Sequence, residues 1–408
     1  MPSNETFVIV GASLAGAKAA EALREQGFDG RVILLGDEVH RPYERPPLSK
    51  GYLTGKAERD SVFVHPANWY SEQNVELQVA TTVTGIDRSR HQIVLADDES
   101  IRYDRLLLTT GARPRPLSLP GSDAAGVHYL RTLDDSESLG RVLATAKRLV
   151  VIGAGWIGLE AAAAARAAGV EVSVVESAEL PLLRVLGPQV ASVFADLHRA
   201  HGVDLRLGVQ LQEITTADGR ATGVRLGDGS LISADAVLIG VGVVPNVSLA
   251  EQAGLEVDNG VLVDDALRSS DPDIFAAGDV ANAFHPLLQR RIRVEHWANA
   301  LKQPKVAAAA MRGEAASYRD LPYFYTDQYD LGMEYVGYVE PGKYDEVIFR
   351  GDAAAREFVA FWLLDGRVLA GMNVNVWDVV EPIKAIISAG ERQEPQRLAD
   401  VSIPLDSL

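Results

Sequence analysis

Residues 7–16 read FVIVGASLAG and residues 149–158 read LVVIGAGWIG, and these two similar stretches decide the fold of the chain. Each reads as an apolar strand, a glycine turn and the start of an alanine-rich helix. A second apolar strand follows in each case and ends in an acid, at Asp37 and at Glu176. Because one such unit holds one dinucleotide, the chain is predicted to bind two. We call the two stretches the first clamp and the second clamp.

The glycines of each clamp have separate tasks. The first permits a tight turn, the second lets backbone approach a pyrophosphate, and the third lets the helix pack on the strand. The helix N-terminus then offers unpaired N–H groups to the phosphates. The second clamp has Gly153, Gly155 and Gly158, whereas the first has Ser13 between Gly11 and Gly16. Serine is small and its hydroxyl can bond a phosphate; the alternative is that Ser13 marks a failed motif.

The acid after the second clamp indicates which nicotinamide nucleotide binds. Glu176 stands 23 positions after Gly153, near the spacing of about 20 that is typical of these units. A carboxylate there accepts hydrogen bonds from the ribose hydroxyls and repels a 2′-phosphate. No arginine follows directly, and Glu179 adds another acid, so NADH is predicted rather than NADPH. The alternative is a solvated acid at a strand end.

Composition narrows the class of protein. The chain has 408 residues, 47% hydrophobic and 23% charged, which suits a globular protein of two or three domains. No apolar run reaches the roughly 18 residues of a membrane helix. The N-terminus lacks the basic and apolar regions of a secretory signal, so we expect a cytoplasmic protein. A net charge of −17 disfavours binding to nucleic acid or to anionic membranes.

The chain contains no cysteine. A disulfide, a thiolate metal site and a cysteine-ligated iron–sulfur cluster are therefore excluded, and no metal site is expected. Several classes of enzyme that combine two nucleotides need a redox cysteine, among them disulfide reductases, thioredoxin reductases and cysteine-dependent NADH peroxidases. This chain cannot perform those reactions.

The pattern along the chain predicts two Rossmann-like α/β domains and a third, C-terminal α+β domain. The first domain is predicted to be discontinuous, over residues 1–110 and 244–319, and the second to cover 111–243. From about residue 320 aromatic residues cluster, and residues 358–362 are interpreted as an alternating apolar pattern, which is typical of a strand. The third domain is predicted over 320–408, with a helix near 381–389.

With these features in hand, the chain resembles over its whole length the FAD-dependent ferredoxin reductases of bacterial haem monooxygenases and Rieske-type dioxygenases. They belong to the glutathione-reductase-like superfamily. Beyond the clamps, the resemblance rests on RPYERPPLSK at 41–50, LLTTGARPR at 107–115, GLE at 158–160, GVGVVPN at 240–246, AGD at 277–279 and YTDQY at 325–329. The RPPLSK part is the most specific of these motifs.

The resemblance implies roles for particular residues. The first clamp would hold FAD, with Asp37 on its adenosine ribose and Asp279 near its ribityl–pyrophosphate part. Lys50 would lie near flavin N5 and pair with Glu160, and these two would be the catalytic residues. The other implied cofactor contacts are Leu14, Ala15, Arg45, Val83, Thr110, Gly111, Arg131, Gly278 and Trp297 for FAD, with Trp156, Ile157 and Gly242 for NADH. Trp156 would be a lid over the nicotinamide; alternatively it packs the turn.

The implied reaction takes a hydride from NADH onto FAD and passes electrons singly to a small 2Fe–2S ferredoxin. Such ferredoxins are typically acidic, so a locally basic docking face is expected. The segment 290–312 has a charge of +5, from six cations and Glu295. The cations are Arg290, Arg291, Arg293, Lys302, Lys305 and Arg312. The alternative is an ordinary solvated helix face.

Other functions remain open from the sequence. One is an NADH oxidase, or a reductase for rubredoxin or a small molecule. Another is an NADH-sensing flavoprotein of the apoptosis-inducing-factor type, which shares the RPPLSK stretch. Close relatives of the reductases often have Trp where this chain has Tyr323 and Tyr325, so an aromatic role in electron exit is undecided against core packing.

Overall fold

The computed structural model of the chain describes residues 4–408. The chain divides into two compact units. Unit 1 comprises residues 1–44, 59–113 and 243–322, and unit 2 comprises 45–58, 114–242 and 323–408. Strands β8 (Ala112–Pro114) and β17 (Val243–Pro245) lie where the chain passes from one unit to the other. The division into three domains with the boundaries given above stays a prediction.

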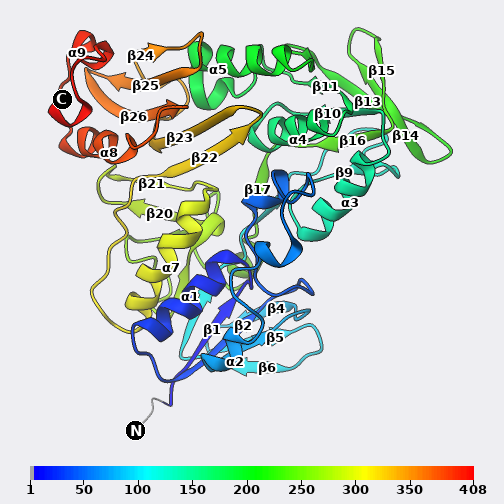
Figure 1. Cartoon of the computed structure of the whole chain (residues 1–408). Helices are drawn as coiled ribbons and strands as arrows, with labels where there is room; N and C mark the ends of the chain where they lie inside the picture. Colours follow the sequence, from blue (N-terminus) through cyan, green and yellow to red (C-terminus); the bar gives the residue numbers. More distant parts are fainter. Residues whose placement is uncertain (1–3) are drawn as a thin grey trace. The chain divides into compact units, whose positions relative to one another are not determined.

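Unit 1 is built on a five-stranded parallel sheet in the order β19-β7-β1-β2-β3; strands β1 and β2 of this sheet are labelled in Figure 1. Its strands are β1 (Thr6–Val10), β2 (Arg31–Leu35), β3 (Val75–Gln78), β7 (Arg105–Leu108) and β19 (Ile274–Ala276). The central strands are buried on both faces, as continuous apolar runs in parallel sheets require. Helix α1 (Leu14–Glu25) packs on this sheet and against α7 (Trp297–Met311). The alanines of both helices permit their close approach.

Smaller elements complete unit 1. The antiparallel sheet β4-β5-β6 joins Val83–Asp87, Gln92–Leu95 and Ser100–Arg102, and the sheet β18-β20-β21 joins Val261–Val263, Ala281–His285 and Arg290–Ile292. The short helices are α2 (Trp69–Glu72), α6 (Ser248–Gln252), η2 (Arg59–Val62) and η3 (Gly278–Val280).

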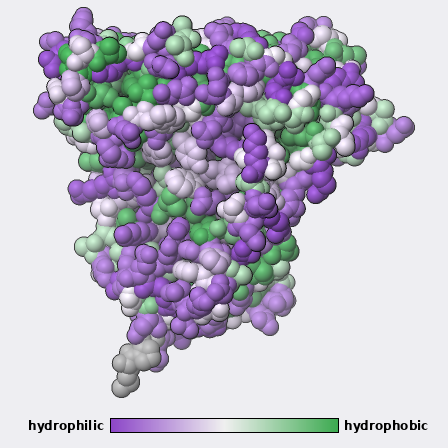
Figure 2. Space-filling model, viewed as in Figure 1, coloured by the Kyte–Doolittle hydropathy of each residue, from purple (hydrophilic) through white to green (hydrophobic). Residues whose placement is uncertain are grey.

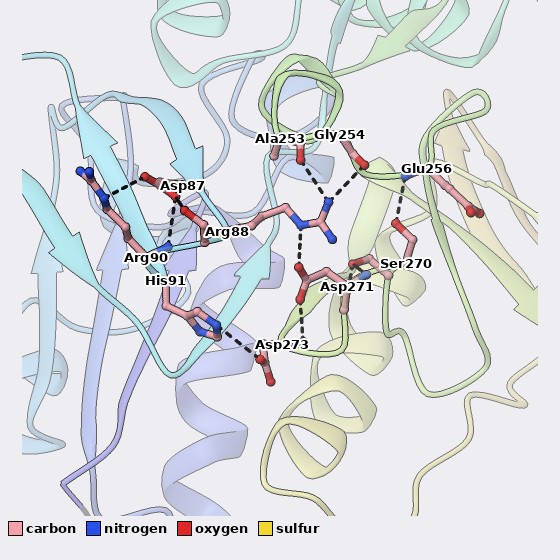
Figure 3. Close-up of polar contacts among 12 residues, drawn as sticks. Asp87, Arg88, Arg90, His91, Ala253, Gly254, Glu256, Ser270, Asp271 and Asp273 are labelled. Atoms are coloured by element: carbon pink, nitrogen blue, oxygen red, sulfur yellow. Dashed lines mark hydrogen bonds and ion pairs between the residues drawn. The ribbon is translucent and has the colours of Figure 1, made fainter.

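Arg88 ties the end of β4 to two later turns of unit 1 (Figure 3). Its Nε donates to Asp271 at 2.6 Å, and Nη1 donates to the carbonyls of Ala253 and Gly254 at 3.3 Å. We expect Arg88→Met to lower the free energy of unfolding by about 1–3 kcal/mol, because it leaves Asp271 and both carbonyls without this donor. Urea unfolding measures this. The control is Arg90→Met, which removes only a pair 3.7 Å apart on a side chain 76% exposed; an equal loss in both variants would contradict the tether.

Unit 2 repeats the order of four strands of the unit 1 sheet, but its fifth strand precedes the other four in the chain, whereas β19 of unit 1 follows them. Its parallel sheet has the order β12-β11-β10-β16-β9. The strands are β9 (Val127–His128), β10 (Arg148–Ile152), β11 (Glu171–Val175), β12 (Asp204–Arg206) and β16 (Ala236–Ile239), with helices α3 (Leu133–Leu143), α4 (Trp156–Ala167) and α5 (Leu183–Ala200). A second, antiparallel sheet joins β13 (Leu211–Ala217), β14 (Arg220–Leu226) and β15 (Leu231–Ser233). The prediction of two Rossmann-like sheets is confirmed.

The C-terminal part of unit 2 is an antiparallel sheet in the order β22-β23-β26-β25-β24, with α8 (Val380–Ala389), α9 (Pro395–Ala399) and η4 (Leu405–Ser407). Its strands are β22 (Tyr323–Gln328), β23 (Leu331–Gly337), β24 (Glu346–Asp352), β25 (Glu357–Leu364) and β26 (Arg367–Val374). The helix expected near 381–389 is confirmed as α8. The alternating pattern read at 358–362 was wrong, because β25 is buried on both faces there.

Two contacts explain that burial. One face of the C-terminal sheet shares a hydrophobic core with α4 and α5, in which Trp362 packs and donates from Nε1 to the Leu186 carbonyl at 3.1 Å. Helix α8 packs against β23 and β26 of this sheet, and α9 packs against β24, where Arg350 also donates to the carbonyls of Asp400 and Ile403. Hydrophobic residues gather on the surface near α9 and β24 (Figure 2). Among residues 4–408, no helix is long and apolar enough to span a bilayer.

Candidate functional site

The turn of the first clamp accepts only glycine at its first and third positions. Gly11 has φ +120°, and a Cβ there would lie 2.2 Å from the Thr109 carbonyl oxygen. A Cβ at Gly16 would lie 2.1 Å from the Gly11 oxygen. The Thr109 hydroxyl donates to that same Gly11 carbonyl at 2.9 Å. β1, β7 and α1 therefore meet backbone to backbone at this turn.

The second position behaves differently, which explains Ser13. At the equivalent Gly155 of the second clamp, a Cβ would meet no atom within 4 Å. Ser13 is the N-cap of α1 in extended conformation, and its side chain makes no capping bond within the described chain. A side chain at this position therefore fits, and the N–H groups of the first helical turn remain uncapped by it. This arrangement suits a bound pyrophosphate.

A second turn of unit 1 lies against the first clamp. Gly278 has φ +77°, and a Cβ there would lie 3.2 Å from the Ala15 side chain. Its N–H donates to the buried Gln303 of α7 at 2.8 Å, which fixes the turn before Asp279. The AGD motif is thus brought next to the start of α1, although it lies far from it in sequence.

The other residues implied for FAD in unit 1 have these positions. Asp37 is exposed beyond β2, and Val83 begins β4. Thr110 and Asn246 exchange two hydrogen bonds of 2.8 Å next to Gly111, whose φ is +66°. Trp297 begins α7 and donates from Nε1 to Glu44 at 3.0 Å. Leu14 and Ala15 are buried in the first turn of α1.

The second clamp, in unit 2, has the same steric design. Gly153 has φ +99°, and its Cβ would lie 2.5 Å from the Gly240 oxygen; a Cβ at Gly158 would lie 2.2 Å from the Gly153 oxygen. Glu176 accepts from the N–H of Ala154 at 2.8 Å, so the acid is held against the glycine turn itself. Its other oxygen accepts from the Ala178 N–H at 2.8 Å.

The aromatic residue of the second clamp, Trp156, is partly buried and packs against the core. Trp156 makes edge contacts with Phe194 and Phe324, at 5.5 and 5.2 Å between ring centroids. Ile157 beside it is 44% exposed, and Gly242 has φ +94°. These contacts are those of a packing residue; the lid over the nicotinamide stays a prediction.

Lys50 and Glu160 form a buried ion pair in unit 2. Lys50 Nζ lies 2.8 Å from Glu160 Oε2, and the side chains are 18% and 4% exposed. Glu160 also accepts from the hydroxyl of Ser49 and, at 2.5 Å, from that of Thr326 on β22. Two hydroxyls and one ammonium thus satisfy a carboxylate that burial would otherwise disfavour.

The segment that carries Lys50 is held in place by hydrogen bonds to α3. Pro46 and Pro47 start the short helix η1 (Pro46–Ser49). The buried Ser136 of α3 donates to the Leu48 carbonyl at 2.8 Å, and Tyr52 donates to Glu137 at 2.8 Å. Lys50 is therefore held on a short, well-anchored segment.

Further side chains surround the pair within unit 2. Lys50 Nζ lies 5.6 Å from the ring centre of Tyr325. Tyr323 donates to Glu334 at 2.7 Å, and burial, with that bond, raises the pKa of Tyr323. Arg45 donates to the carbonyl of Arg131 at 2.6 Å, so these two predicted contacts lie side by side.

Sequence reasoning missed the two hydroxyls on Glu160. Ser49 and Thr326 stand inside RPPLSK and YTDQY, motifs that were noted for other residues. Their position directly beside Lys50 and Tyr325 was the only signal available, and it does not reveal that both point at one carboxylate.

The basic segment is less basic than the sequence count indicates. Arg293 is only 7% exposed and pairs with Glu295 at 2.5 Å. Lys302 pairs with Asp320 at 2.9 Å, and Arg312 with Glu314 at 3.0 Å. Asp320 and Glu314 lie outside the counted segment, and the exposed cations within it are Arg290, Arg291 and Lys305.

Residues 5–304 match the family described as pyridine nucleotide-disulphide oxidoreductase, and residues 323–408 match the family described as reductase C-terminal. The chain is 42% identical to putidaredoxin reductase of Pseudomonas putida, over 100% of this chain and 97% of that one. It is 39% identical to the ferredoxin–NAD(+) reductase component of the anthranilate 1,2-dioxygenase system of Burkholderia cepacia, over 99% of each.

Solved structures agree. The covalent putidaredoxin reductase–putidaredoxin complex superposes with a TM-score of 0.94 at 40% identity, covering 99% of this chain and 98% of that one. A ferredoxin reductase from Rhodopseudomonas palustris gives a TM-score of 0.95 at 40% identity, covering 99% of each. With two clamps of the required geometry and relatives along its whole length, the chain belongs to the pyridine nucleotide-disulphide oxidoreductase family, as a ferredoxin-reductase-type flavoenzyme that uses FAD and NAD(H).

Proposed function

We propose that this protein carries electrons from NADH, through FAD, to a small 2Fe–2S ferredoxin that feeds a haem monooxygenase or a Rieske-type oxygenase. The observation that carries the proposal is the pair of complete clamps in a chain that is 42% identical, from end to end, to a putidaredoxin reductase. We also propose a cytoplasmic location, because NADH is a cytoplasmic reductant.

In this proposal the first clamp and the Gly278 turn hold FAD. The uncapped start of α1 would bind its pyrophosphate, with Ser13 at the position where a side chain fits. Asp37 would accept from its ribose, and the other FAD residues named above would contribute packing and polar contacts. FAD, when bound, supplies the conversion between two-electron and one-electron chemistry.

The second clamp would place NADH, and the Lys50–Glu160 pair would position charge. Glu160 keeps Lys50 in one place, since its buried carboxylate is 2.8 Å from the ammonium. A fixed cation next to an electron-rich ring stabilises the reduced state without reorganising at the moment of transfer. These two residues need to exchange no proton with a substrate, because hydride transfer requires alignment rather than acid–base chemistry.

Glu176 would select NADH. We expect Glu176→Gln to lower the ratio of kcat/KM for NADH over NADPH about tenfold, because the amide keeps a hydrogen bond but no longer repels a 2′-phosphate. Steady-state kinetics with both nucleotides measure the ratio. Glu171→Gln, at an exposed acid that begins β11 at the end opposite Glu176, is the control and should leave the ratio unchanged. An unchanged ratio in Glu176→Gln would mean that Glu176 only hydrogen-bonds to the glycine turn and does not select between the nucleotides.

The docking face is proposed to centre on Arg290, Arg291 and Lys305. Anaerobic stopped-flow of NADH-reduced protein with oxidised 2Fe–2S ferredoxin tests both the function and the face. We expect fast transfer that slows at least tenfold as salt rises from about 0.05 to 0.5 M. Lys305→Gln should slow transfer severalfold at low salt, and Lys147→Gln, another exposed lysine, should not.

An NADH oxidase, a reductase for another acceptor and an NADH sensor are the alternatives. Electron transfer to ferredoxin no faster than the loss to oxygen would favour an oxidase or another acceptor. A long-lived complex between NADH and the flavin, without turnover, would favour the sensor.

A further inference from the structure

Behind Glu160 a row of buried polar side chains runs through unit 2. Thr326 donates to Glu160 at 2.5 Å, and Gln328 Nε2 donates to the Thr326 hydroxyl at 3.3 Å. Gln328 Oε1 lies 2.8 Å from His198 Nε2 on α5, and His198 Nδ1 lies 3.3 Å from the Tyr329 hydroxyl. Thr326, Gln328 and His198 are each at most 1% exposed.

The carboxylate at one end dictates the direction of every bond in the row. An ionised Glu160 only accepts, so the Thr326 hydroxyl must donate to it and can accept only from Gln328. The Gln328 amide then points its NH₂ at Thr326 and its oxygen at His198. His198 must therefore carry its proton on Nε2, which leaves Nδ1 to accept from Tyr329.

We propose that Thr326, Gln328 and His198 are positioning residues for the Lys50–Glu160 pair, acting as a one-way hydrogen-bond chain that holds the Glu160 carboxylate in place. The inference rests on the proposed role of that pair in flavin reduction. Each bond in such a chain polarises the next, and a fully satisfied buried network rigidifies its members. Leaving any member without its partner is costly at this burial.

The outer end of the chain is kept in the required state. Burial lowers the pKa of His198 to about 4, although the Gln328 bond acts in the opposite direction. His198 is therefore neutral at physiological pH and can accept at Nδ1. The Tyr329 ring is itself stacked on His201, at 3.7 Å between ring centroids.

The first test measures the chain directly. ¹⁵N NMR of the histidine-labelled holoenzyme reports which nitrogen of His198 carries the proton. We expect only the Nε2–H tautomer of His198 in the wild type and a mixture of the two tautomers in Thr326→Val. Without the Thr326 hydroxyl, the Gln328 amide can flip and present either its oxygen or its NH₂ group to His198. Thr326→Ser keeps a hydroxyl and should restore the single tautomer. Thr216→Val, at an exposed strand position, is the matched control and should change nothing.

The second test measures the consequence. We expect Thr326→Val to slow flavin reduction by NADH about tenfold, the equivalent of one hydrogen bond to a charged group. Thr326→Ser should recover most of the rate. Gln328→Met breaks the hydrogen-bond chain at the residue that follows Thr326 in it and should also give a mixture of His198 tautomers. If Thr326→Val does not fold, Gln328→Met supplies both the tautomer measurement and the rate of flavin reduction.

The outcomes separate this inference from the function it rests on. A His198 proton on Nδ1, or one tautomer unchanged in Thr326→Val and Gln328→Met, overturns the chain. If Thr326→Val changes the His198 tautomer but not the rate of flavin reduction, while Glu160→Gln slows that reduction, the positioning role is overturned and the proposed function stands. If Glu160→Gln is also as fast as the wild type, the role of the pair fails and the inference falls with it.

Discussion

Gly11→Ala should be purified largely without FAD and should lose about 3–5 kcal/mol of unfolding free energy. The added Cβ would lie 2.2 Å from the Thr109 carbonyl oxygen, so backbone in β7 or in the turn must move. That movement displaces the start of α1, where the pyrophosphate is proposed to bind. The flavin-to-protein absorbance ratio and the unfolding midpoint measure the two effects. Lost flavin lowers the midpoint further, since a ligand that binds only the folded state stabilises it.

Gly27→Ala is the matched control for this prediction. Gly27 also has positive φ, +81°, but a Cβ there would meet no atom within 4 Å. Its cost should be confined to backbone strain of about 1–2 kcal/mol, with full FAD content. If both variants keep FAD and lose the same stability, the close approach of Gly11 to Thr109 has no role in the clamp.

Lys50→Met should slow flavin reduction by NADH about a hundredfold, the scale on which a preorganised charge contributes to a reaction. It should also lower the unfolding free energy by about 3 kcal/mol, because it leaves the Glu160 carboxylate buried beside two hydroxyls without its cation. Stopped-flow absorbance measures the rate, and urea unfolding measures the stability.

Adding Glu160→Gln to Lys50→Met separates the two effects. The double variant has no buried charge to compensate, so most of the stability should return while the rate stays low. Lys384→Met is the control, because it breaks a surface pair of 2.6 Å with Glu381 and should change neither quantity appreciably. A double variant that regains the wild-type rate would show that the cation does not act on the reaction.

The two parallel sheets and their glycine turns could be predicted because their signals are local. An apolar strand, a glycine at a turn that needs positive φ and a small-residue helix lie within about 30 neighbouring residues, so the sequence itself displays the unit. The same reasoning failed at 358–362. Those residues are apolar in a row, and only the packing of α4 and α5 on one side of the sheet and of α8 and α9 on the other shows why β25 has no exposed face.

The charges of the basic segment show a second kind of failure. Counting residues 290–312 gives +5, but Asp320 and Glu314 lie beyond its end and take up Lys302 and Arg312. A charge count along the sequence cannot include partners that the fold brings in from outside the window.

By itself, the sequence determined the two dinucleotide units and the absence of cysteine chemistry, because each is carried by neighbouring residues or by composition; the selection of NADH by Glu176 stays a prediction. Only the tertiary structure decided what surrounds Glu160. Three side chains from distant parts of the chain converge on the Glu160 carboxylate of α4. They are Ser49 at the end of η1, Lys50 directly after it, and Thr326 on β22. The cause is the burial of that carboxylate, which must be satisfied by whichever donors the packing of distant elements brings within reach.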